Sequence, residues 1–168
     1  MADEPRNDDR VDRILAEWRR ERPDLDTTPQ AVIGRLHRLA MILDRAIDDE
    51  FARFGISQGE FDVLATLRRA GNPYRRSAGE LAEHTMISTG GLTKRVDRLV
   101  ARGLVQREGD ASDGRRRHIS LTPAGLELVE RAVEGHTANE HRLISGLDGD
   151  APHLAELLSR WLRALDVD

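Results

Sequence analysis

Residues 88–125 read STGGLTKRVDRLVARGLVQREGDASDGRRRHISLTPAG, and this stretch decides the fold. Its first part predicts a helix over 89–101, because apolar residues recur at helical spacing before Gly103, a residue that suits the position just after a helix. Short apolar pairs then flank the polar segment 107–118, a pattern typical of two strands joined as a hairpin. The stretch therefore predicts one helix followed by a β-hairpin.

The helix over 89–101 has two different faces. Its apolar stripe comprises Leu92, Val96, Leu99 and Val100. The opposite face carries Gly90, Lys94, Asp97 and Arg98. Ser88 and Thr89 add hydroxyls and amides at its start, which bind phosphates or base edges in DNA-reading helices. These features suit a helix that enters a major groove, although the spacing alone also fits an ordinary amphipathic surface helix.

Two further helices should precede this one, each with its own start signal. Ser57 and Glu60, and again Ser77 and Glu80, match the capping box, in which a hydroxyl and a carboxylate satisfy free backbone amides. The second of these helices is short and joins the helix over 89–101 through a few residues, which predicts a helix-turn-helix. Because a basic hairpin follows this helix-turn-helix, the whole region is predicted to be a winged helix-turn-helix.

Outside this region the chain is helical. An N-terminal extension, 1–27, contains one amphipathic helix over 8–21. Long apolar patterns over 28–56 and 122–168 predict a helical lobe that surrounds a DNA-binding lobe at 57–121. The fold class is thus mainly α with a small β-hairpin wing, and helices this long need apolar partners along their length.

The distribution of charge reverses what the total suggests. The 168 residues carry 26 basic and 30 acidic side chains, a net charge of −4, which by itself argues against a nucleic-acid partner. Residues 1–67 have a net charge of −5, residues 68–118 of +6 and residues 119–168 of −5. The cationic share therefore lies in the predicted winged lobe, where Arg115, Arg116 and Arg117 form a run that suits a narrow minor groove or, alternatively, plain solvated surface.

Several classes of function find no support in the sequence. The absence of cysteine excludes disulfides and thiol-based sensing. His136 and His141 are five residues apart and do not match metal-ligand spacing, so we expect no metal and no cofactor. Catalytic motifs are lacking, which argues against an enzyme. The chain shows neither a membrane-spanning run nor a signal peptide, and we expect a cytoplasmic protein.

The stretch from Gly55 to Gly125 resembles the MarR family of dimeric winged helix-turn-helix regulators, and 113–115 with Leu121, Thr122 and Gly125 fits that family's wing signature. The resemblance implies a homodimer, formed by interleaved terminal helices, that binds a pseudo-palindromic operator in double-stranded DNA as a probable repressor. It also implies which residues face the major groove: Ser88, Thr89, Thr93, Lys94 and Arg98. Arg115, positioned by Asp113 and followed by Arg116, would enter the minor groove.

The added N-terminal helix, together with the run Thr93-Lys-Arg-Val-Asp-Arg-Leu in the helix over 89–101, resembles the urate-responsive, PecS- and HucR-type subgroup of this family. The resemblance implies a ligand site made of Trp18, Asp62, Arg95 and Arg107, with urate or xanthine as the small anionic ligand. An indole can stack on a purine, and arginines can pair with its oxygens. Each residue also has a simpler explanation, because Trp18 completes an apolar stripe, while Asp62 and Arg107 fit solvated surface. A different aromatic acid as ligand, or ligand-independent nucleoid-type DNA binding, remain alternatives.

Overall fold

A computed structural model describes residues 8–85, 91–109 and 117–165, and divides the chain into two units, Met1–Ala46 and Ile47–Asp168. The first unit contains α1 (Arg10–Glu21) and most of α2 (Gln30–Ala52). Asp9 caps α1 by accepting from the amides of Val11 and Asp12. Arg35 of α2 forms ion pairs with Asp9 and Asp12, at 2.9 and 2.7 Å, so the start of α1 is held on α2.

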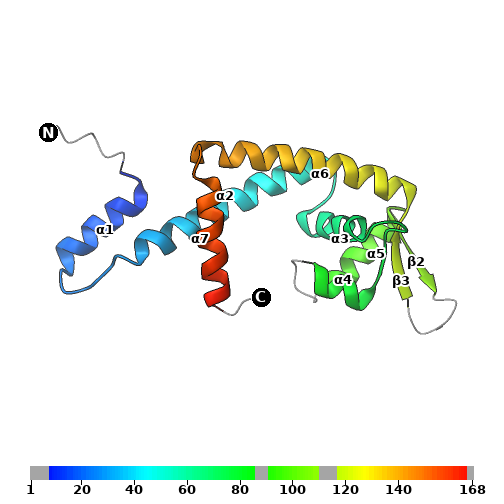
Figure 1. The fold of residues 1–168 in the computed structure, drawn as a ribbon, viewed down its shortest axis with the longest axis horizontal. Coiled ribbons are helices and arrows are strands. Elements are labelled where there is room, and N and C mark those ends of the chain that lie inside the picture. The colour runs from blue at the N-terminus through cyan, green and yellow to red at the C-terminus, as the bar shows by residue number, and fades with distance from the viewer. Residues whose placement is uncertain (1–7, 86–90, 110–116, 166–168) are drawn as a thin grey trace. The chain divides into compact units, whose positions relative to one another are not determined.

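The second unit contains the winged helix-turn-helix that the sequence predicts (Figure 1). Its helices are α3 (Gln58–Arg69), α4 (Ala78–His84), α5 (Leu92–Ala101), α6 (Pro123–Ile144) and α7 (Ala151–Ala164), with a 3₁₀ turn at Ser145–Leu147. Both predicted capping boxes, at Ser57 and at Ser77, are present. The helix-turn-helix is α4 and α5, and its connecting residues 86–90 lie outside the described part of the chain.

The wing is part of a three-stranded antiparallel sheet with the order β1-β3-β2. β2 (Val105–Gly109) and β3 (Arg117–Leu121) form the predicted hairpin, whose tip, 110–116, is outside the described residues. β1 (Arg75–Ser77) was not expected, because three polar residues next to a helix start carry no strand pattern. It pairs with β3 from Arg75↔Ser120 to Ser77↔His118.

One hydrophobic core holds the second unit together. Its buried members come from α3, α4, α5, the sheet, α6 and the end of α2, and include Phe51, Val63, Leu64, Leu67, Leu81, Val96, Leu99, Val105, Ile119 and Val129. The stripe predicted on α5 is buried at Leu92, Val96 and Leu99, whereas Val100 is 36% exposed at its margin. The core thus fixes α5 against α3 and the sheet with its polar face outward.

Among the described helices, none combines the length and the apolar character that a bilayer crossing requires. The division of the chain into an extension, a helical lobe and a winged lobe stays a prediction, since α2 continues from the first unit into the second.

Candidate functional site: a DNA-reading helix beside a pocket

The candidate DNA-reading residues divide into described and undescribed positions. Thr93 and Lys94 are exposed on α5. The side chain of Arg98 is 54% exposed, and its Nε donates to Oε1 of Glu60 on α3 at 2.8 Å. The predicted contacts Ser88, Thr89, Asp113, Arg115 and Arg116 lie outside the described residues.

Arg95 lies inward on α5, as its position at the edge of the apolar stripe predicts. Its side chain is half-buried and passes over Gly59 of α3 and Gly91, where a Cβ on either glycine would overlap the guanidinium group. Nη1 of Arg95 is buried and has no hydrogen-bond partner among the described residues. A buried guanidinium nitrogen without an acceptor is costly, so this group is available to donate a hydrogen bond to a ligand oxygen.

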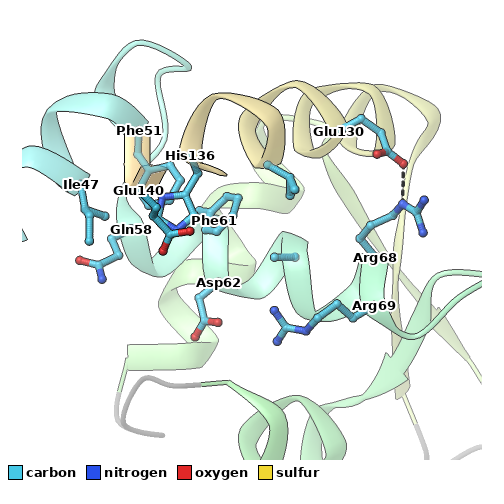
Figure 2. A pocket seen from close by; sticks show the side chains of 12 residues that line it. Ile47, Phe51, Gln58, Phe61, Asp62, Arg68, Arg69, Glu130, His136 and Glu140 are labelled. Carbon is cyan, nitrogen blue, oxygen red and sulfur yellow. Dashed lines mark hydrogen bonds and ion pairs between the residues drawn. The ribbon is translucent and has the colours of Figure 1, made fainter. Parts of the chain in front are cut away.

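A pocket of about 660 Å³ opens between α3, α6 and the end of α2 (Figure 2). We call it the α3 pocket, and its lining is Ile47, Phe51, Gln58, Phe61, Asp62, Ala65, Arg68, Arg69, Glu130, Val133, His136 and Glu140. Phe51, Phe61 and His136 pack ring against ring at one end, with centroids 4.2 to 5.3 Å apart. Asp62 and Arg69 extend from α3 on another side, while Arg68 turns to Glu130.

Within the second unit, the candidate ligand residues Asp62 and Arg107 line two different pockets. Asp62 is half-buried in the α3 pocket, one helical turn after the Gly59 that Arg95 covers. Arg107 on β2 donates to Oδ1 of Asp97 at 2.6 Å and borders a separate pocket of about 360 Å³ between α5 and the sheet. Trp18 belongs to the first unit, where its side chain is 41% exposed on α1.

The electrostatics of the site centre on Glu60. Burial would raise the pKa of Glu60, but the hydrogen bond from Arg98, the Ser57 amide and the charge of Arg98 outweigh it, so its pKa is lowered. Within the described residues, no three His, Cys, Asp or Glu side chains gather closely enough to hold a metal ion.

Known proteins are similar to this chain in sequence and in fold. A family model described as the MarR family matches residues 54–116. The HTH-type transcriptional regulator PecS of Dickeya dadantii (strain 3937) is 42% identical over 151 residues, which cover 89% of this chain and 91% of PecS. The chain belongs to the MarR family.

Solved structures of MarR-family proteins agree with this assignment. Sco3205, a MarR family transcriptional regulator from Streptomyces coelicolor crystallised in complex with DNA, matches with a TM-score of 0.74 and 26% identity, over 84% of this chain and 91% of Sco3205. A mutant of MarR from E. coli complexed with operator DNA matches with a TM-score of 0.67 and 26% identity, over 82% and 99%. This MarR-family chain is a PecS-like DNA-binding transcriptional regulator and not an enzyme.

Sequence reasoning missed several residues of this MarR-family site. The capping box revealed Glu60, but not its second bond, to Arg98, 38 residues away. Asp97 was placed on the outer face of α5, with no sign that it pairs with Arg107. Nothing in the sequence indicated that Arg69 and His136 line a common pocket, because its walls come from α3 and α6, which are far apart in sequence.

Proposed function

We propose that this regulator binds a pseudo-palindromic operator as a homodimer and is released from it by a small anionic purine such as urate or xanthine. The observation that carries the ligand proposal is the buried Nη1 of Arg95, which has no hydrogen-bond partner within the described part of the chain. Arg95 belongs to α5, the helix that we expect to read DNA. A planar anion offers in-plane oxygens to such a guanidinium group, which is a strong and geometrically specific pairing.

The surroundings of Arg95 favour a flat, anionic ligand. Arg95 lies against α3 one turn before Asp62, which is half-buried in the α3 pocket. That pocket is large enough for a purine, and its lining includes the ring of Phe61 and the cation of Arg69. We assign the stacking role to Trp18 on the strength of the resemblance to the urate-responsive subgroup.

Both candidate arginines are connected to α5, so a ligand that binds either of them can change how this helix meets DNA. Arg95 is part of the helix, and Arg107 is attached to it through Asp97. An anion that binds Arg107 competes with Asp97 and loosens the wing strand β2 from α5. An anion that binds Arg95 pulls on α5 directly and displaces it toward the ligand. Either event changes the placement of the helix, and a ligand that prefers the displaced state lowers DNA affinity.

The homodimer is supported by apolar surface left exposed among the described residues. Val32, Ile33, Leu39, Met41 and Ile42 of α2 are 40 to 74% exposed. Leu157, Leu162 and Leu165, on and just after α7, are 39 to 58% exposed. Runs of apolar side chains of this kind mark protein interfaces, and a second copy of the chain is the partner that a pseudo-palindromic operator requires.

Thermal shift with urate, xanthine and salicylate tests the ligand. We expect urate or xanthine to raise the melting temperature of the wild-type protein and to weaken its DNA binding. Trp18→Ala and Arg95→Ala should lose the response. Arg131→Ala removes an exposed arginine of α6 outside the α3 pocket and should keep it. If no purine stabilises the protein, or if Arg95→Ala responds like the wild type, the purine proposal is wrong and DNA binding stands.

Titration of DNA binding with salt tests the proposed wing contact. Arg115→Ala should weaken binding to all sequences and reduce the salt dependence by about one phosphate contact. Substitution of Thr93 or Lys94 should instead change the preference among sequences. Wild-type affinity of Arg115→Ala at moderate salt would contradict the minor-groove role of this residue.

A further inference from the structure

Glu60 has a different task for each of its carboxylate oxygens. Oε2 accepts from the amide of Ser57 at 3.0 Å and closes the capping box of α3. Oε1 accepts from Nε of Arg98 at 2.8 Å and so reaches the outer half of α5. The residue is only 6% exposed, whereas the side chain of Arg98 is 54% exposed. One buried carboxylate thus joins the start of α3 to the DNA-reading helix.

Glu60 also balances an unusual concentration of positive charge. Three arginines on or just after α5 approach the first turn of α3: Arg95 lies over Gly59, Arg98 bonds to Glu60, and Nη1 of Arg102, the residue that follows α5, lies 3.7 Å from Oε2 of Glu60. The start of a helix carries a partial positive charge, which repels cations. Glu60 supplies the compensating negative charge at this junction.

We propose that Glu60 is a positioning residue for DNA binding, which holds Arg98 and thereby α5 in the orientation that fits the major groove. Because Nε of Arg98 donates to Glu60, this edge of the guanidinium group is held against α3, while the side chain as a whole remains 54% exposed. The inference rests on the DNA binding of this family and not on the identity of the ligand.

The alternative role of Glu60 predicts an effect of opposite sign. A carboxylate that merely lies near DNA repels phosphate, so its neutralisation should strengthen binding to any duplex. If Glu60 is a positioning residue, its neutralisation should instead weaken DNA binding. The loss should be limited to a duplex whose sequence the helix reads. The sign of the effect therefore separates the two roles.

Glu60→Gln is the informative variant, because glutamine keeps the capping box while it removes the charge that Arg98 requires. Glu80→Gln is the matched control, since Glu80 holds the same position in the capping box of α4. Binding is measured to a duplex that the wild-type protein enriches from a random-sequence pool, and to a scrambled duplex. We expect Glu60→Gln to bind the selected duplex about fivefold more weakly, with no loss on the scrambled one. Glu80→Gln should show no loss on either.

Two further variants complete the test. Glu60→Asp is the substitute variant if Glu60→Gln folds poorly. Aspartate keeps the charge, but its shorter side chain moves the carboxylate away from Arg98, so we expect the same selective loss. The double variant Glu60→Gln with Arg98→Gln should bind no more weakly than Arg98→Gln alone, because both changes break one interaction. Equal or tighter binding of the selected duplex by Glu60→Gln, or additive losses in the double variant, would overturn the proposal. Neither result would affect release by a purine.

Discussion

The ionised side chain of Glu60 makes the stability of the second unit depend on pH. Its pKa is lowered from 4.5 in the folded protein, so its contribution is complete above that value and is lost as the pH falls through the lower folded value. Glu60→Gln should lower the free energy of unfolding at neutral pH by about 1 kcal/mol, a figure that allows for solvent around Arg98. Urea denaturation should show this difference shrinking as the pH falls below about 4.5 and then through the lower folded value. A difference that stays constant would contradict the assignment.

At the scale of single residues, the sequence predicted contacts within one helix but not contacts between elements that are distant in sequence. The bonds between Ser57 and Glu60 follow from a spacing of three residues, and α3 begins where they require. The inward position of Arg95 follows from the angle between side chains on one helix. The pairs of Glu60 with Arg98 and of Asp97 with Arg107 depend on how α3 and β2 pack against α5, which no periodicity encodes.

At the scale of the elements, Gly125 allows α6 to begin directly against the strand that leads into the wing. A Cβ on Gly125 would overlap the backbone carbonyl of Leu104, which also accepts from the amide of Thr122. Because backbone cannot rotate away as a side chain does, Gly125→Ala should lower the free energy of unfolding by about 2 kcal/mol.

Gly79→Ala is the control for this prediction. Gly79 lies in α4, and the nearest atom to its added Cβ is Oγ of Ser77 at 4.0 Å. Alanine there should stabilise the protein by about 0.5 kcal/mol, because it restricts the unfolded chain and favours the helix. Thermal or urea denaturation of both variants checks the pair. A similar effect of the two substitutions on stability would show that the contact with Leu104 is not the reason for glycine at position 125.

The helices were the predictable elements of this fold. Repeated apolar spacing and capping boxes located them to within a few residues. β1 was not predictable, because its residues, Arg75, Arg76 and Ser77, show no alternation and become a strand only where β3 offers its free edge. The α3 pocket was not predictable either, since its walls come from α2, α3 and α6.

At the scale of the whole molecule, we expect the chain to be a dimer whose apolar contacts include α7. Leu157 and Leu162 are 39 and 49% exposed, so their replacement by aspartate should leave the fold intact but prevent association. Sedimentation analysis should give twice the chain mass for the wild type and one chain mass for Leu157→Asp with Leu162→Asp, with a large loss of operator affinity. Arg160→Asp changes another exposed position of α7 and should stay dimeric. A monomeric wild type would contradict the dimer.

The pairing of β3 with both β1 and β2 has a consequence for how the wing can move. β1 ends at Ser77, the residue that caps α4, so the base of the wing and the first helix of the helix-turn-helix are joined without a linker. The base of the wing and α4 should therefore turn together, and the amides of β3 should be the slowest in the sheet to exchange with solvent. A small rotation of α4 would then carry the base of the wing with it, so a change that displaces one of them would displace both.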